Sequence, residues 1–238
     1  MAVILNIETA TRVCSVGVSI DGKLIALKES HTKNSHAEQI TLFVEEVLNK
    51  SGITTKELDA VAVSKGPGSY TGLRIGVSTA KGLCYGLDIP LIGINTLEAM
   101  ANGMINLINK TDNPTTSDAL ICPMIDARRM EVYSSVFSLK LKIIEETMAK
   151  IIDSSSYGNF LKDNNVYFAG DGAEKCKQSL SHNQNAIFLD DFHPSASYLC
   201  NLANDKFNND DFDNSAYFEP YYLKDFVAGI SKVKGLRM

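Results

Sequence analysis

The sequence predicts an α/β protein whose chain folds into two lobes. Segments of strand and helix alternate along the 238 residues, and three consecutive strands precede the first helix. Hydrophobic residues make up 45% of the chain and charged residues 21%, which is typical of a folded globular protein. A stretch rich in turn formers, 110–117, separates the two halves. We therefore expect an N-terminal lobe at 1–110 and a C-terminal lobe at 111–238.

The N-terminal lobe begins with three predicted strands in a β-meander. Asp21-Gly22 is a two-residue hairpin signal, because type I′ turns need positive φ. Apolar residues at helical spacing then follow Ser35-x-x-Glu38, the pattern of a capping box. The expected strands are 2–7, 13–20, 23–29, 60–64 and 91–94, and the expected helices are 35–50, 54–58, 71–85 and 95–109.

The second half repeats the alternation of strands and helices. The turn Gly170-Asp171-Gly172 introduces a helix after an apolar strand, and a second helix is expected at 195–207. The run 204–214 is rich in Asn and Asp, and we interpret it as a solvated acidic loop. The expected strands of this half are 119–125, 131–139, 143–151 and 166–169.

Charge and cysteine content exclude several classes of protein. The chain has 23 basic and 28 acidic side chains, a net charge of −5, which disfavours a strongly basic nucleic-acid binder. The five cysteines are far apart and form no C-x-x-C pair, so we expect neither a zinc ribbon nor a redox motif. No signal peptide or membrane span is predicted. We expect a soluble, cytoplasmic protein.

The first candidate site is the turn between the first two strands. Glu8 ends a strand, Thr9 and Thr11 follow it, and a second strand comes next. In actin-like ATPases such a hairpin offers backbone N–H groups and hydroxyls to phosphates, and the acid helps to hold a metal. The same residues also suit an ordinary β-meander, so both interpretations stay open.

The second candidate is the run Gly66–Gly72 and the helix that it starts. The turn could hold an anion at the helix N-terminus, or Ser69 could simply cap the helix. Interior glycine costs roughly 1 kcal/mol, so the glycines within this helix need a reason. Close approach of another helix would provide one, either within the lobe or at a subunit interface. The residues predicted for a partner interface are Gly72, Ile75, Gly76, Thr79 and Leu83.

Evidence for catalysis and for metal binding is weak. The chain has neither H-E-x-x-H nor G-x-S-x-G, and His36 is better explained as an N-terminal helix residue than as a ligand. We assign no catalytic residue and no metal site. Arg128 and Arg129 follow an apolar strand, where they could contact phosphate or pair with Asp126 or Glu131.

Six motifs together resemble the TsaB (YeaZ) family over nearly the whole chain. They are ILNIETATRVCSVGV, SKGPGSYTGLRIGVSTAKGL, INTLEA, DARRMEVY, GDGAEK and PYYLKDFV, in the family's order. The resemblance implies an actin-like (ASKHA) two-lobed fold with mixed sheets flanked by helices. It also implies a non-catalytic subunit that pairs with a TsaD-like catalytic paralogue, joined by a TsaE-like ATPase. That complex threonylcarbamoylates the tRNA adenosine next to the anticodon.

One departure bears on activity. The catalytic relatives bind metal through a His-x-x-x-His pair, whereas here His36 is followed four residues later by Ile40. The resemblance therefore implies a scaffold that requires no cofactor, although the hairpin at Glu8, Thr9 and Thr11 leaves room for weak nucleotide binding. It allows a homodimer through the same helices, and it allows contact with tRNA through the complex, for which Arg128 and Arg129 are the candidate residues. The alternative is an independent actin-like ATPase or phosphotransferase.

Overall fold

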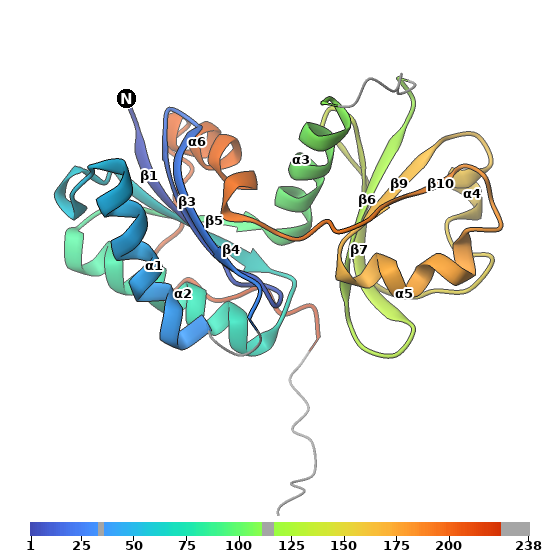
Figure 1. Ribbon diagram of the computed structural model, residues 1–238, viewed down its shortest axis with the longest axis horizontal. Helices are drawn as coiled ribbons and strands as arrows, with labels where there is room; N and C mark the ends of the chain where they lie inside the picture. The colour runs from blue at the N-terminus through green and yellow to red at the C-terminus, as the bar shows by residue number, and fades with distance from the viewer. Residues whose placement is uncertain (33–35, 111–116, 225–238) are drawn as a thin grey trace, which may run out of the picture.

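The structure is a computed structural model that describes residues 1–32, 36–110 and 117–224. It has two lobes side by side, each built on one five-stranded mixed sheet (Figure 1). The predicted α/β class and two-lobed arrangement are therefore confirmed. The expected capping box at Ser35 and most of the linker 110–117 lie outside the described residues.

The N-terminal sheet has the strand order β3-β2-β1-β4-β5. Strands β1, β2 and β4 are buried almost throughout, because helices cover both faces of the sheet. One face packs against α1 and α2, and the other against α6 and part of α3. The elements are β1 Val3–Glu8, β2 Cys14–Ile20, β3 Lys23–Ser30, α1 His36–Ser51, η1 Thr55–Glu57, β4 Ala60–Gly66, α2 Tyr70–Leu87 and β5 Leu91–Asn95.

The C-terminal sheet has the order β10-β9-β6-β7-β8. Helix α3 covers one face, and α4 and α5 cover the other. The elements are α3 Thr96–Ile108, β6 Leu120–Asp126, β7 Glu131–Ser138, β8 Ile143–Ile151, α4 Gly158–Leu161, β9 Val166–Ala169, α5 Asp171–Leu180, β10 Ala186–Leu189, η2 Ala196–Tyr198 and α6 Cys200–Asn208.

Most predicted elements occur within a few residues of their expected positions, with two corrections. The hairpin at Asp21-Gly22 is confirmed, with φ of 49° and 75°. The helix expected at 195–207 is divided into η2 and α6, and α6 continues to Asn208, so the acidic loop expected at 204–214 begins later. Strand β10 and the one-turn helix α4 were not predicted.

The chain crosses between the lobes, so a boundary at residue 110 separates the sheets but not all the packing. Helix α3, from the first half, places Met100 and Met104 in the core of the C-terminal lobe. Helix α6, from the second half, packs Ala203 against Ile4 and Ile92 of the N-terminal sheet. The segment 1–110 therefore lacks part of its own core when taken alone.

Glycines at the start of α2 let the β1–β2 turn lie directly on the helix. A Cβ at Gly72 would overlap the carbonyl oxygen of Thr9, and one at Gly76 would overlap the Thr9 hydroxyl. Thr9 Oγ1 donates to the Gly72 carbonyl at 2.8 Å, and the Ser69 amide donates to the Ala10 carbonyl at 2.6 Å. We call this contact the turn seat.

The turn seat corrects one part of the sequence interpretation. Gly72 and Gly76 were assigned to a partner interface, but both are buried against Thr9 of the same chain. Intrachain packing therefore explains why these two positions are glycine. Of the five residues predicted for the interface, Ile75, Thr79 and Leu83 remain partly exposed.

We predict that Gly72→Ala destabilises the protein, whereas Gly82→Ala on the same helix does not. The new methyl at position 72 meets backbone, which cannot rotate away, so we expect a loss of about 1–3 kcal/mol. A methyl at position 82 would have nothing within 4 Å of it, and the better helix propensity of alanine should contribute up to about 1 kcal/mol. Urea unfolding measures both. Equal stability of the two variants would contradict the turn seat.

Candidate functional site

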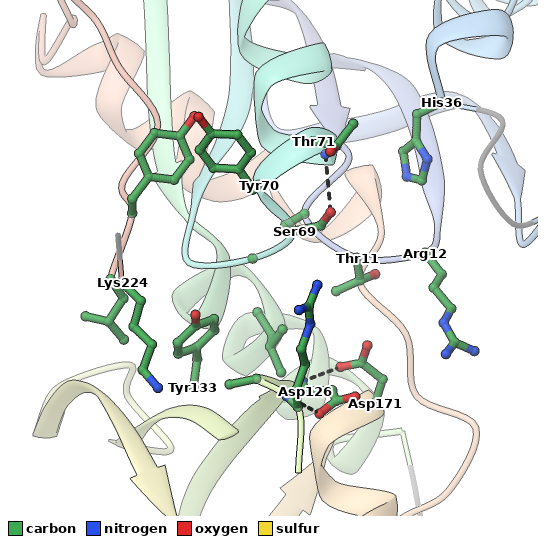
Figure 2. Close-up of a pocket in the computed structure, with 18 of the residues that line it drawn as sticks. Thr11, Arg12, His36, Ser69, Tyr70, Thr71, Asp126, Tyr133, Asp171 and Lys224 are labelled. Carbon is green, nitrogen blue, oxygen red and sulfur yellow. Dashed lines mark hydrogen bonds between the residues drawn. The ribbon is translucent and has the colours of Figure 1, made fainter. Parts of the chain in front are cut away.

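A cleft of about 1110 Å³ lies between the two lobes. The N-terminal lobe contributes the β1–β2 turn and the beginnings of α1 and α2, and the C-terminal lobe contributes the β6–β7 turn and the beginning of α5. Residues 222–224 line it on one side, where Lys224 lies near Tyr133, while Arg12 and His36 lie on the other side (Figure 2). Clefts between two domains are a common location of ligand-binding sites, so this cleft is the candidate functional site.

The predicted phosphate hairpin is only partly at this cleft. Glu8 and Thr9 are fully buried, and neither lines the cleft, whereas Thr11 does. Glu8 Oε1 accepts a hydrogen bond from the Ala10 amide at 2.6 Å, and Thr9 is occupied in the turn seat. The side chains of Glu8 and Thr9 therefore hold the turn in shape and are not presented to a ligand.

Burial changes the chemistry of Glu8. Its Oε2 has no hydrogen-bond partner, and desolvation raises its pKa from 4.5 to about 7, against the smaller lowering effect of the hydrogen bond from the Ala10 amide. With this pKa, about half of the Glu8 carboxyl groups are protonated at pH 7, and the protonated form is a poor ligand for a hard cation. This weakens the metal-holding role that the hairpin pattern suggested.

The two positions that correspond to the metal-binding His-x-x-x-His pair of the catalytic relatives are His36 and Ile40. His36 begins α1 and is only 8% exposed, with Nε2 3.1 Å from the Val13 carbonyl oxygen. Ile40, four residues later, is 2% exposed in the core of the lobe. Within the described residues, no group of three or more His, Cys, Asp or Glu side chains is placed to hold a metal.

Two carboxylates form the C-terminal wall of the cleft. Asp126 forms an ion pair with Lys175 and accepts a hydrogen bond from the Arg128 amide at 2.8 Å. Asp171 accepts from the Asp126 amide at 2.9 Å, and its pKa is raised by desolvation first and by the charge of Asp126 second. Both side chains are thus engaged in shaping the wall.

The β6–β7 turn presents two arginines. Arg128 and Arg129 have φ of 71° and 51°, an unusual conformation for two consecutive non-glycine residues. The ion pairs expected with Asp126 and Glu131 are not formed, since these acids pair with Lys175 and Lys224. Arg128 lines the cleft, and Arg129 beside it is exposed, so the predicted contact with tRNA remains a prediction.

A second concave surface lies between α1 and α2. This groove has a volume of about 400 Å³ and includes Thr79 and Leu83 of the predicted interface. Gly82 and Gly86 lie on the exposed side of α2, and a Cβ added at either position would have no neighbour within 4 Å. The sequence had marked Gly82 as an interior glycine that needs a reason, but neither Gly82 nor Gly86 was among the residues predicted for the interface. The groove is lined by Thr41, Val44, Glu45, Leu48, Asn49, Ile53, Thr54, Thr55, Thr79 and Leu83.

Comparison with known proteins identifies the class. A family model described as TsaD, tRNA N6-adenosine threonylcarbamoyltransferase, matches residues 29–232. A solved structure, YeaZ from Pseudomonas aeruginosa, superposes with a TM-score of 0.78 over 94% of this chain and all of that chain, at 22% identity. The protein thus has the two-lobed fold of that YeaZ structure, and it belongs to the class of proteins that the TsaD family model describes.

Sequence relatives narrow the class to one family. The tRNA threonylcarbamoyladenosine biosynthesis protein TsaB of Haemophilus influenzae is 30% identical over 236 residues, which cover 94% of each chain. TsaB of Escherichia coli is 38% identical over 130 residues, covering 55% of this chain and 52% of that protein. The chain belongs to the TsaB family. In the part that the structure describes, no helix is both long and apolar enough to span a membrane.

We predict that the stability of the protein falls between about pH 4.5 and pH 7 because of Glu8. Its pKa is higher in the folded state, so the folded chain binds the proton more tightly and loses this advantage as the pH rises. The shift corresponds to about 3 kcal/mol. Glu8→Gln keeps an acceptor for the Ala10 amide and cannot ionise.

Urea unfolding of both forms at pH 5 and pH 8 tests this prediction. The wild-type protein should lose more stability than Glu8→Gln over this interval, because other titrating groups act equally in both. Parallel changes in the two proteins would show that Glu8 is already ionised in the folded state at pH 5, and therefore that burial does not raise its pKa.

Proposed function

We propose that the protein is a non-catalytic subunit that activates a TsaD-like transferase by docking through the outer face of α1 and α2. In this role it serves the threonylcarbamoylation of the tRNA adenosine next to the anticodon, in the cytoplasm. Family membership supports the pathway, because the relatives are named for threonylcarbamoyladenosine biosynthesis. The observation that carries the docking site is the pair of bare glycines, Gly82 and Gly86, beside the groove.

The cleft supports a role without catalysis. The position that would hold the second metal ligand is the core residue Ile40. The acids that an ATPase or phosphotransferase could use here are Glu8, Asp126 and Asp171. Glu8 is buried, Asp126 is paired with Lys175, and Asp171 accepts a hydrogen bond from the Asp126 amide. The alternative of an independent ATPase therefore has little support in this geometry.

The outer face of α2 suits a helix of a partner. Small residues let two helices approach more closely than the usual 8–10 Å, and apolar side chains then become buried around the crossing. Here Gly82 and Gly86 leave the helix surface bare, while Leu83 and the apolar groove lie next to them. Leu42 on α1 and Tyr85 on α2 are 60% and 90% exposed, and both would be covered by such a contact.

A paralogue with the same fold is the partner that this face fits. It would present two equivalent helices, and the complex would contain a four-helix contact. A second copy of this chain has the same helices, so a homodimer would compete with the paralogue for this face. A TsaE-like ATPase would join the complex, and Arg128 and Arg129 would contact tRNA bound to it. Weak nucleotide binding beside Thr11 is compatible with this role.

We predict that Gly82→Leu weakens binding of the TsaD-like paralogue by about 5- to 150-fold. The added side chain stands at the helix crossing, and overpacking of this kind costs about 1–3 kcal/mol. Gly158→Leu is the matched control, because a side chain at Gly158 would also begin in open space but lies in the other lobe. Isothermal titration with the purified paralogue measures the affinities, and sedimentation measures any homodimer.

Two results would count against the proposal. Wild-type affinity of a folded Gly82→Leu variant would place the interface elsewhere. Turnover of ATP or threonylcarbamoyl transfer by this chain alone, without the paralogue, would favour the enzymatic alternative.

A further inference from the structure

The segment that follows α6 returns along the N-terminal lobe and ends at the cleft. We call residues 213–224 the strap. It begins beside β5, where the Asp213 amide donates to the Leu91 carbonyl at 2.9 Å and Asp213 Oδ2 accepts from the Gly93 amide at 2.7 Å. This segment includes Tyr221 and Tyr222 of the motif PYYLKDFV, to which the proposed function gives no role.

Helix α2 and β4 hold the middle of the strap. Lys81 Nζ donates to the carbonyls of Ala216 at 3.2 Å and Phe218 at 3.0 Å. Further along, the Tyr221 amide donates to the Lys65 carbonyl at 2.7 Å. The strap is therefore fixed to the N-terminal lobe through its backbone, independently of most of its side chains.

The last anchor on the N-terminal lobe is an aromatic and cationic cluster. Arg74 Nε donates to the hydroxyl of Tyr222 at 3.1 Å, and its guanidinium carbon lies 4.1 Å from the centre of the Tyr70 ring. The rings of Tyr70 and Tyr222 have centres 4.9 Å apart. These contacts place Tyr222 at the wall of the cleft.

Beyond Tyr222 the strap reaches the other lobe. Lys224 forms an ion pair with Glu131, the first residue of β7. The lobes are also joined by the direct passage from β5 into α3 at Asn95–Thr96 and by the segment 190–195. The second of these includes His193, which lines the cleft. Figure 2 shows Lys224 and Arg12 on opposite sides of the cleft.

We propose that the strap is a latch that sets how far the two lobes open. It is fixed to one lobe by Lys81, Lys65 and Arg74, and it reaches the other through Lys224 and Glu131. Opening of the cleft on this side would separate Lys224 from Glu131, because Lys224 lies only two residues after Tyr222, the last anchor on the N-terminal lobe. The latch is a property of the isolated chain and does not depend on the proposed partner.

The size of the effect follows from the exposure of the pair. The side chains of Lys224 and Glu131 are 44% and 22% exposed, so solvent screens their attraction. Loss of the pair should change the ratio of open to closed molecules by about two- to fivefold. A latch of this strength opens readily without disturbing the fold.

Distances between nitroxide labels on the two lobes test the latch. Cysteines introduced at the exposed positions Lys56 and Lys162 can be labelled selectively, because all five native cysteines are buried. Double electron–electron resonance should show a larger fraction of long distances in Lys224→Gln and in Glu131→Gln. Lys140→Gln removes one exposed positive charge elsewhere and should resemble the wild type.

A variant that carries both substitutions tests whether Lys224 and Glu131 act on the opening through their ion pair. If the two residues act as one latch, Lys224→Gln combined with Glu131→Gln should shift the distances no further than either single change. An unchanged distribution in the single variants would overturn the proposal. So would shifts that add in the double variant, because the residues would then act separately.

Discussion

The contact between the β1–β2 turn and the start of α2 constrains the rest of the N-terminal lobe. Thr9 lies against Gly72 and Gly76 so closely that a Cβ at either position would overlap it. This contact sets the height of α2 above the sheet, and Val77, Ala80 and Cys84 then fill the space behind it. It also sets where the outer face of α2 is presented, since a helix is rigid over this length.

The turn seat explains why a hairpin with the layout of a phosphate site has lost most of that character. In the turn seat, the Thr9 hydroxyl donates a hydrogen bond to the Gly72 carbonyl, and the Ala10 carbonyl accepts one from the Ser69 amide. Glu8 stabilises the turn by accepting a hydrogen bond from the Ala10 amide. Its other carboxyl oxygen, Oε2, is buried without a hydrogen-bond partner. Of the three residues predicted for the hairpin site, Thr11 alone lines the cleft. Residues that could bind a ligand have become residues that position a helix.

The order of the strands and helices could be predicted from the sequence, but what each side of a helix contacts could not. Hydrophobic periodicity predicted α2 and its core side, but the same periodicity cannot tell whether a glycine faces another part of the chain or solvent. Gly72 was therefore assigned to a partner interface although it lies against Thr9, whereas the open position is Gly82, and only three-dimensional packing distinguishes the two. Strand β10 was missed because it is four residues long and half-buried. The pairing of Lys224 with Glu131 spans 93 positions, which no local pattern encodes.

Three sides of helix α2 have different surroundings: the β1–β2 turn, solvent and the strap. With about 100° between successive residues, Gly72 and Gly76 point about 80° away from Gly82 and Gly86. Arg74 and Lys81, which hold the strap, lie about 110° further round. One helix thus contacts the turn, the open surface and the strap through distinct sides. Because the helix is rigid, a displacement imposed on its open side must also move the groups that hold the strap, and through them the pair that joins the two lobes.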